Sequence, residues 1–284
     1  MTEDYLELNS PAKINWLLHV GAKRPDGYHD LVTLFQELEL SEKMRFRILH
    51  KEECRLSGYP PDISAESNLV TRAWQLMRQE FPGRIAGLDV QVDKSLPQGG
   101  GLAGGSSNCA AALKAINILN NLELTDDKLQ ELGSRLGSDV PFFIRGGLAL
   151  GRGRGEILEP LPSPPSYHLV LIMPPERMST SEAFRLLDSV QRVSLSPHTM
   201  FHFLTELQSG EINRLARVVK NDFEFVAEKY DWFIRARQNL LDAGAIKVLL
   251  CGSGSTVAGF GRDLDHVQQI ALQCGGIVSR TVGP

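Results

Sequence analysis

The sequence feature that most constrains the fold is a dense glycine cluster that leads directly into an alanine-rich apolar segment. The stretch KSLPQGGGLAGGSSNCAAALKAINILN begins at Lys94, and its glycines are Gly99, Gly100, Gly101, Gly104 and Gly105. Glycine loses more conformational freedom than any other residue when it is fixed, so this density indicates a backbone that approaches another group closely. A strand before the loop and a helix after it suit an anion, because unpaired N–H groups at a helix N-terminus point outward and the helix dipole favours negative charge. The loop therefore predicts a phosphate-binding site.

Other interpretations of the loop fit the sequence less well. A flexible turn with a helix cap is the plainest, although one glycine would suffice for a turn. The P-loop motif G-x-x-x-x-G-K-[ST] needs a lysine that does not follow these glycines. The dinucleotide motif G-x-G-x-x-G matches Gly99, Gly101 and Gly104 literally, but it should lead through a helix into a parallel strand that ends in an acidic residue. Here the helix leads into another helix, and Glu123 lies in the connection between them.

The rest of the chain has the pattern of an α+β protein. In the first part, alternating or apolar runs predict strands over residues 5–10, 12–20, 29–40, 43–49 and 88–96, and a hairpin over 146–161. Helical spacing in that part predicts helices over 66–81, 107–122 and 125–137. Beyond it, we expect strands at 167–174 and on both sides of the turn in 245–261, and helices over 179–190, 198–208, 211–230, 232–244 and 265–274.

A proline cluster, EPLPSPPS, separates two apolar segments and predicts a domain boundary. With 284 residues, the chain is near the size at which one hydrophobic core divides into two. We therefore expect a first domain over residues 1–160, which contains the glycine loop, and a second over residues 161–284, which contains a smaller Gly-Ser turn.

Charge and composition argue against several classes of partner. The net charge is −4 and no Lys/Arg run stands out, so nucleic acid is a poor candidate. The longest apolar runs are far too short to span a bilayer, and the N-terminus lacks the apolar region of a secretory signal. The four cysteines are scattered, with no C-x-x-C pair and no metal-ligand spacing. These features predict a cytoplasmic protein with reduced thiols.

The longer pattern LPQGGGLAGGSSNCA resembles the phosphate loop of the GHMP kinase superfamily, named for galactokinase, homoserine kinase, mevalonate kinase and phosphomevalonate kinase. The usual form of that loop is P-x-G-x-G-L-G-S/G-S-S/A, and Ala103 stands where the family usually has glycine. If this position needs a positive φ, alanine costs about 1 kcal/mol there. The resemblance implies a two-domain α+β fold, with an N-terminal S5-like nucleotide-binding domain and a C-terminal ferredoxin-like domain.

Three more stretches resemble one branch of that superfamily, the kinases that act on 4-diphosphocytidyl-2-C-methyl-D-erythritol. They are SPAKINWLLHVGAKRPDGYHDLVTLFQ, LGSDVPFF and LLCGSGSTVAGF, and the resemblance runs in order from about Ser10 to about Phe260. It implies phosphorylation of the 2-hydroxyl of that substrate with ATP and Mg²⁺, in the methylerythritol phosphate route to isoprenoids. The alternatives are another small-alcohol kinase of the superfamily, of the mevalonate or homoserine type, and a non-catalytic ligand-binding member of the fold.

The resemblance assigns two catalytic residues. Asp139 would be the base that accepts the proton of the substrate hydroxyl, although an Asp two residues before a proline is also a good helix N-cap. Lys13 would keep Asp139 ionised and stabilise charge on the phosphoryl oxygens, although a lysine on a strand is usually solvent-facing.

The resemblance also assigns the residues around ATP. Asn68, Lys94 and Ser95 match positions near the adenosine, and a solvated surface role is an equal alternative for Lys94. The phosphate cradle would be Pro97, Gln98, Gly99, Gly100, Gly101, Leu102, Ala103, Gly104, Gly105, Ser106, Ser107 and Asn108. No carboxylate can be named for the metal from the sequence, and Ser107 is the one candidate ligand.

On the substrate side, the resemblance places Tyr28 and His29 after a PDG turn, where they would hold the cytosine. Phe35 and Phe184 would complete an aromatic clamp around the base, with burial in the core as the alternative for each. Asn15 and Thr180 would also contact the substrate. The turn Gly252–Ser255 either lines the diphosphate or is only a tight hairpin turn.

Overall fold

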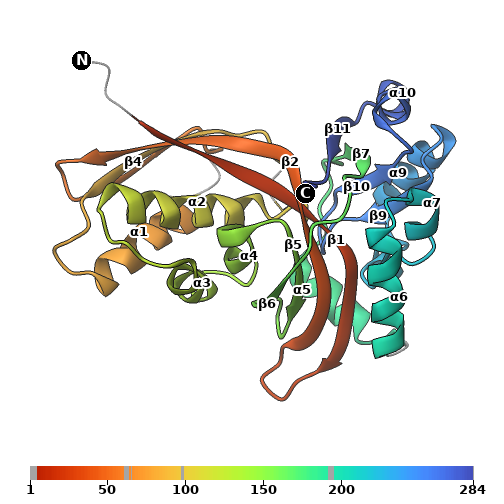
Figure 1. The fold of residues 1–284 in the computed structure, drawn as a ribbon, viewed down its shortest axis with the longest axis horizontal. Helices are drawn as coiled ribbons and strands as arrows, with labels where there is room; N and C mark the ends of the chain where they lie inside the picture. Colours follow the sequence, from red (N-terminus) through yellow and green to blue (C-terminus); the bar gives the residue numbers. More distant parts are fainter. Residues whose placement is uncertain (1–4, 61–63, 65, 97–98, 191–194, 284) are drawn as a thin grey trace. The chain divides into compact units, whose positions relative to one another are not determined.

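The computed structural model describes residues 5–60, 64, 66–96, 99–190 and 195–283. Strands and helices alternate along the chain in an α+β arrangement (Figure 1), as the sequence predicts. The chain forms two compact units: unit 1 is Met1–Ala12, Ser41–Gln98 and Ala103–Gly146, and unit 2 is Lys13–Leu40, Gly99–Leu102 and Gly147–Pro284. Both units are discontinuous in the sequence, and the expected boundary between residues 160 and 161 stays a prediction about domains.

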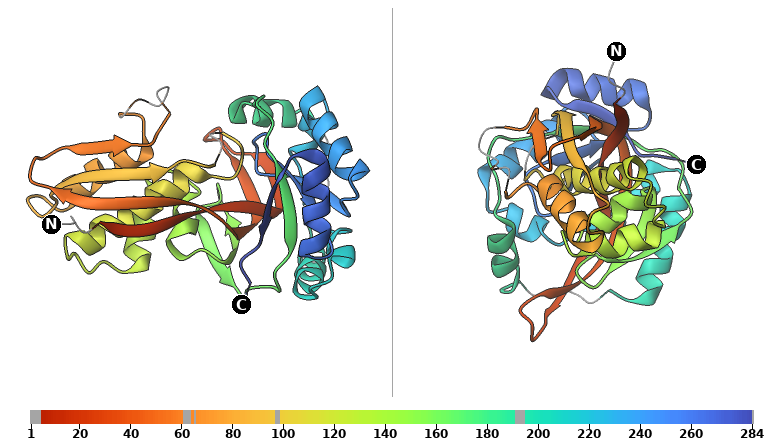
Figure 2. Two further views of the ribbon diagram at one scale, coloured as in Figure 1. Left: turned by 90° about the horizontal axis from the view of Figure 1, so that it is seen from above. Right: turned by 90° about the vertical axis from the view of Figure 1, so that its left-hand side faces the viewer.

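Two long strands pass through both units. Strand β1 spans Leu6–Lys23 and strand β2 spans His29–Leu49 (Figure 2), where the sequence pattern suggested two shorter strands in each case. Residues 12–20 of β1 are buried on both faces of the strand. The alternation therefore does not separate a core face from a solvent face here, and the polar side chains of this segment lie inside the protein.

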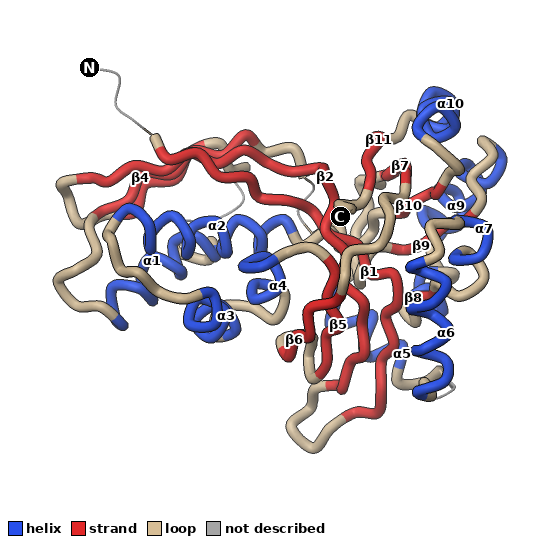
Figure 3. Tube along the Cα trace, viewed as in Figure 1, coloured by secondary structure: helices blue, strands red, loops and turns tan. Residues whose placement is uncertain are grey.

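The described residues of unit 1 combine parts of these two strands with further strands and helices. Strand β3 (Cys54–Ser57) pairs in parallel with β4 (Gly87–Asp93), and β4 pairs antiparallel with Lys43–Leu49 of β2. The helices, which pack against one another and are seen together in Figure 3, are α1 (Leu69–Glu80), α2 (Gly104–Leu119), α3 (Asp126–Ser134) and α4 (Val140–Arg145).

The strands of unit 2 form two sets. Strand β5 (Leu148–Arg152) pairs antiparallel with β2 and with β6 (Ile157–Leu161), which confirms the predicted hairpin. The short strand β8 (Lys220–Asn221) pairs in parallel with β1. An antiparallel sheet has the order β11-β7-β10-β9, built from β7 (His168–Ile172), β9 (Lys247–Leu250), β10 (Val257–Phe260) and β11 (Ile277–Arg280). The sequence did not predict β11.

The predicted helix over residues 211–230 is wrong. The segment divides into α7 (Ile212–Leu215), strand β8 and α8 (Glu224–Ala227). The cause is bonding to β1: the Asp222 N–H donates to the Leu18 carbonyl at 2.9 Å, and the Asp222 carboxylate accepts from the Val20 N–H at 2.9 Å. These tertiary hydrogen bonds override a local helical preference, which is worth only a few tenths of a kcal/mol per residue.

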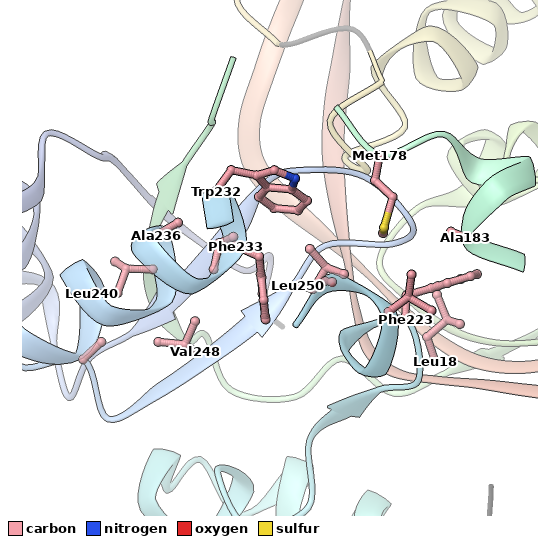
Figure 4. Packing of buried hydrophobic residues seen from close by; sticks show 14 of the residues in the cluster. Leu18, Met178, Ala183, Phe223, Trp232, Phe233, Ala236, Leu240, Val248 and Leu250 are labelled. Carbon is pink, nitrogen blue, oxygen red and sulfur yellow. The ribbon is translucent and has the colours of Figure 1, made fainter. Parts of the chain in front are cut away.

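The other helices of unit 2 agree with the sequence prediction and are α5 (Thr180–Leu187), α6 (Pro197–Gln208), α9 (Asp231–Asp242) and α10 (Leu264–Cys274). Helix α9 places Trp232 and Phe233 in a core with Val248 and Leu250 of β9 (Figure 4). Burial of each large apolar side chain contributes about 1.5–3 kcal/mol, so this cluster fixes α9 and β9 to each other. No helix in the described part of the chain is long and apolar enough to cross a membrane.

Candidate active site

The start of helix α2, in unit 1, is built to receive an anion. This helix has 16 residues, and its first hydrogen bond joins the Ser107 N–H to the Ala103 carbonyl. The N–H groups of Gly104, Gly105 and Ser106 therefore have no acceptor within the helix. Other helices, such as α1 and α3, are capped by a polar side chain, whereas among the described residues no side chain caps α2. An external negative group is the natural cap for such an end.

Two features of the first turn support this interpretation. Ala103 has φ 57° and lies in the left-handed region, so the condition under which alanine costs energy at this position is met. Ser107 is 1% exposed, and its hydroxyl has no hydrogen-bond partner among the described residues. Because an unsatisfied buried hydroxyl costs free energy, Ser107 is suited to a ligand or ion that approaches the helix end. Gly105 is exposed, and a Cβ atom added there would meet nothing within 4 Å.

Lys94 is not a solvated surface lysine, so that alternative is wrong. Its ammonium donates to both oxygens of Glu42, at 2.7 and 3.0 Å, and the Glu42 side chain is fully buried. Glu42 also accepts from the backbone N–H groups of Ser95 and Leu96. A Cβ atom at Gly104 would lie 3.6 Å from the Lys94 ammonium, so a positive charge is held beside the start of α2.

The amides expected near ATP are engaged inside unit 1. Asn68 caps α1 by accepting from the Val70 N–H at 2.9 Å. The side-chain Oδ1 of Asn108 accepts from the Ser10 hydroxyl at 2.5 Å, and its Nδ2 donates to the Tyr59 hydroxyl at 3.3 Å. Contact of either residue with ATP stays a prediction. Pro97 and Gln98 lie outside the described residues.

The other part of the glycine loop, Gly99–Leu102 in unit 2, packs against the turn that connects β9 and β10. A Cβ atom at Gly101, where φ is 84°, would lie 1.8 Å from the Cys251 carbonyl oxygen. A Cβ atom at Gly254 would lie 2.1 Å from the Gly101 nitrogen, and the Thr256 N–H donates to the Gly100 carbonyl at 3.0 Å. Glycine is required here because two backbones touch. The Gly252–Ser255 segment is thus a turn between antiparallel strands, and it also holds the loop.

Lys13 lies in β1 and is 3% exposed, so the solvent-facing alternative is wrong. Its ammonium donates to Asn15 Oδ1 at 2.8 Å and lies 5.7 Å from the centre of the Phe35 ring. Its backbone N–H donates to the Leu102 carbonyl at 3.2 Å. Lys13 is therefore attached to the glycine loop through the main chain, and its charge is desolvated by the surrounding protein.

Asn15 orients Lys13. Besides accepting from the lysine, its amide donates to the Thr33 hydroxyl at 2.7 Å, and Thr33 donates to the Leu17 carbonyl at 2.8 Å. Asn15 is 1% exposed, and both ends of its amide are engaged.

Burial raises the pKa of the nearby Cys251 thiol to about 12, so this cysteine stays protonated and is no nucleophile at neutral pH.

Asp139 stands at the N-cap position of α4 in unit 1. Among the described residues, its side chain accepts no capping hydrogen bond from that helix, which weakens the capping alternative. A Cβ atom at Gly137 would lie 3.9 Å from the Ser106 hydroxyl oxygen. The segment that leads to Asp139 therefore runs past the first turn of α2, where the anion site is expected.

His29 is held within unit 2 by both of its ring nitrogens. Nδ1 lies 3.1 Å from the Gly21 carbonyl oxygen and Nε2 lies 3.1 Å from Asp188 Oδ1. The ring is 7% exposed and stacks on Phe184, with 5.2 Å between the ring centres. The imidazole thus orients Phe184, and its nitrogens are already occupied by groups of the protein.

The remaining substrate-side residues differ in exposure. Tyr28 is 54% exposed, with the Arg154 guanidinium 5.1 Å from its ring centre. Phe35 is 3% exposed, as the core alternative predicts, and lies against Gly151 and Gly155. Thr180 lies within hydrogen-bonding distance of Ser253, with 2.9 Å between the hydroxyl oxygens. Of the aromatic residues assigned to the clamp, Tyr28 therefore offers the most exposed ring.

Sequence reasoning missed three polar partners of these residues: Glu42 behind Lys94, Thr33 behind Asn15, and Asp188 behind His29. Each lies at least 18 positions from its partner in the sequence, so no local spacing connects them. Thr33 alone gave a signal, because it lies in a predicted strand, where a polar side chain that turns inward needs a partner.

Comparison with known proteins shows which family the chain resembles. The model described as GHMP kinases N terminal domain matches residues 68–147, and the model described as GHMP kinases C terminal matches residues 203–276. The 4-diphosphocytidyl-2-C-methyl-D-erythritol kinase of Geobacillus kaustophilus is 37% identical over 93% of this chain and 91% of its own.

Solved structures give the same result. A crystal structure of 4-(cytidine 5'-diphospho)-2C-methyl-D-erythritol kinase has a TM-score of 0.84 at 30% identity, covering 98% of this chain and 100% of the other. The homoserine kinase of Cytophaga hutchinsonii has a TM-score of 0.75 at 19% identity, covering 100% of this chain and 96% of the other, which shows a shared fold alone.

Proposed function

The chain belongs to the GHMP kinases and, within them, to the 4-diphosphocytidyl-2-C-methyl-D-erythritol kinases, and we propose that it transfers the γ-phosphoryl group of ATP to the 2-hydroxyl of 4-diphosphocytidyl-2-C-methyl-D-erythritol. The observation that carries the proposal is the 37% identity with a kinase of that name over nearly the whole of both chains. The product would serve the methylerythritol phosphate route to isoprenoid precursors.

The ATP phosphates would cap helix α2. The N–H groups of its first turn that have no acceptor within the helix, the open space above Gly105 and the Lys94 ammonium beside Gly104 together suit a polyanion. Phosphoryl transfer needs little covalent chemistry from the protein and depends on positioning and on neutralising charge. The amino end of α2 supplies both from groups that the fold already holds in place.

Lys13 and Asp139 would act on the reacting atoms. The Lys13 ammonium, oriented by Asn15, would stabilise the negative charge that spreads over the transferred phosphoryl oxygens. The Asp139 carboxylate, which α4 does not use as a cap among the described residues, would accept the proton of the attacking hydroxyl. The proton moves from the substrate oxygen to Asp139 as that oxygen bonds to phosphorus and the bond to the ADP oxygen breaks.

Mg²⁺ would be held mainly by the phosphates. Among the described residues no group of three or more His, Cys, Asp or Glu could hold a metal ion, and Mg²⁺ in nucleotide sites often takes only one or two protein ligands. The Ser107 hydroxyl, which has no partner in the described part of the chain, fits such a role. When bound, the ion would neutralise charge on the triphosphate.

The cytidine end of the substrate would meet Tyr28, whose exposed ring offers a stacking surface, while His29 holds Phe184 in place. Base–aromatic stacking contributes about 1–3 kcal/mol per base in single-strand binding, a comparable contact. We expect Tyr28→Ala to weaken binding of the cytidyl substrate and to leave ATP affinity nearly unchanged. Equal effects on both substrates would remove Tyr28 from the cytidine site.

The alternatives have less support. A homoserine or mevalonate type of specificity rests on structures less than 20% identical, and these share only the fold. A non-catalytic member would have no need to bury Lys13, which is 3% exposed.

The test is a product assay with ATP, Mg²⁺ and one of three alcohols: the cytidyl substrate, mevalonate or homoserine. We expect ADP release and a phosphorylated product, identified by mass spectrometry, with the cytidyl substrate alone. Lys13→Met and Asp139→Asn should each lower kcat by about 10²–10⁴ while thermal stability stays near that of the wild type. Turnover of another alcohol in place of the cytidyl substrate would contradict the proposal.

A further inference from the structure

Asn221 lies in β8, the two-residue strand that interrupts an otherwise helical sequence pattern. It pairs with Leu18 of β1 and is 3% exposed. A buried amide must satisfy its own hydrogen bonds, so the contacts of Asn221 define what it holds in place.

Its amide fastens the beginning of the turn between β9 and β10. The Asn221 Nδ2 group donates to the Leu250 carbonyl at 2.8 Å and to the Gly252 carbonyl at 2.7 Å, while Oδ1 accepts from the Phe223 N–H at 3.0 Å. Glu224 secures the same place, because its carboxylate accepts from the Leu250 N–H at 2.8 Å. The segment from Asn221 to Glu224 thus fixes the carbonyls of Leu250 and Gly252, one on each side of Cys251.

The other side of this turn faces the residues assigned to the reaction. A Cβ atom at Gly252 would lie 3.1 Å from the Lys13 ammonium and 2.9 Å from the Gly101 carbonyl oxygen. A displacement of Gly252 toward these groups would therefore press on the Lys13 side chain or on the glycine loop, since neither leaves room for even a methyl group.

We infer that Asn221 is a positioning residue for phosphoryl transfer, which it serves by fixing Gly252 and, through it, Lys13 and the Gly99–Leu102 half of the loop. The inference rests on the proposed function, because it assigns Asn221 a part in that reaction. Only a planar amide supplies two N–H donors for the two carbonyls and an oxygen for the Phe223 N–H, so aspartate, which cannot donate to them when ionised, is no substitute.

The test is the kinetics of Asn221→Ala with ATP and the cytidyl substrate. Misplacing a reacting group by about 1 Å can cost about 10²-fold in rate, so we expect kcat to fall by about 10- to 100-fold. Both Michaelis constants should stay near their wild-type values, because the binding contacts are not removed. In a Lys13→Met background, Asn221→Ala should lower kcat no further, since the group that it positions is gone.

Asn117 provides a matched control. Its amide holds a loop in unit 1 by donating to the Leu124 carbonyl at 3.1 Å and accepting from the Leu124 N–H at 2.9 Å. Asn117→Ala should lower the unfolding temperature, as Asn221→Ala does, but should leave kcat unchanged. The difference between the two variants separates positioning from plain stability.

Two results would overturn the inference. One is a kcat for Asn221→Ala close to that of Asn117→Ala. The other is that Asn221→Ala lowers kcat by the same factor in the Lys13→Met background as in the wild type. If Asn221→Ala yields no folded protein, Asn221→Ser, which keeps one donor, is judged by the same criteria. A wild-type protein that does not phosphorylate the cytidyl substrate would instead contradict the proposed function.

Discussion

The two halves of the glycine loop use glycine for different reasons. In Gly99–Leu102, the space that a side chain at Gly101 would fill is already taken by the backbone of the Cys251–Gly254 turn. In the segment Ala103–Ser107, Gly105 faces open space and the helix end is uncapped among the described residues. At Gly101 the protein packs on itself, whereas the open space at Gly105 is where we propose that the ATP phosphates lie.

Each half is also associated with one residue assigned to catalysis. The Leu102 carbonyl accepts a hydrogen bond from the backbone N–H of Lys13. Ser106 lies beside Gly137, and Gly137 belongs to the segment that leads to Asp139. A continuous stretch of nine residues therefore has one half that supports the lysine and one that borders the aspartate. The comparison teaches that a glycine motif is no evidence that every glycine in it touches the ligand.

The largest expected effect is on stability, at Gly101. A Cβ atom there would lie 1.8 Å from the Cys251 carbonyl oxygen at a left-handed φ of 84°. Overpacking costs about 1–3 kcal/mol and left-handed strain about 1–2 kcal/mol, so Gly101→Ala should lower the free energy of unfolding by about 2–5 kcal/mol. Urea unfolding measures this. A stable Gly101→Ala that only loses ATP affinity would erase the distinction between the two halves.

A smaller loss is expected at Glu42, which anchors the chain before the loop. Glu42→Gln retains one acceptor for Lys94, Ser95 and Leu96 but removes a buried negative charge from the ammonium. Hydrogen bonds to charged groups are worth about 1.5–3 kcal/mol, and the variant should lose about that much stability. A rise in the Michaelis constant for ATP should accompany it, because Lys94 then loses its fixed place beside α2. An unchanged free energy of unfolding and unchanged kinetics would show that Glu42 anchors neither the Lys94 ammonium nor the chain before the loop.

The smallest effect is expected at Ala103, and it has the opposite sign. Glycine adopts φ 57° without the strain that alanine has there, although it also gives the unfolded chain more freedom. Ala103→Gly should therefore raise the free energy of unfolding by about 0.5–1 kcal/mol and leave the kinetics unchanged. Destabilisation by this change would mean that the left-handed start of α2 is not strained.

Much of this account could be predicted from the sequence, and the misses have a common cause. The helical spacing of α1 and of α3 is local, and both helices were predicted correctly. The helix expected over 211–230 failed because Asn221 and Asp222 bond to residues far away in the sequence. Asn221 and Asp222 are adjacent polar residues within a largely apolar pattern, which was the available sign that the helix is interrupted.

The site residues show the same division. The glycine loop can be recognised from a short stretch of sequence, because its composition departs from that of any ordinary turn. The engagement of both His29 nitrogens could not be predicted, since Gly21 and Asp188 meet the ring only in the folded chain. The same holds for Glu42, which in the sequence resembles any charged residue on a strand.

The most direct test of the central claim is an ATP titration of Gly105→Ala by calorimetry, together with its thermal unfolding. Alanine at this helical, unobstructed position should keep or raise stability, by up to about 1 kcal/mol, because alanine favours helix over glycine. If the phosphates of ATP approach the start of α2, the added methyl group should raise the dissociation constant for ATP by about tenfold, or about 1.4 kcal/mol. A stable Gly105→Ala protein that binds ATP as tightly as the wild type would contradict the assignment of this half of the loop to the nucleotide.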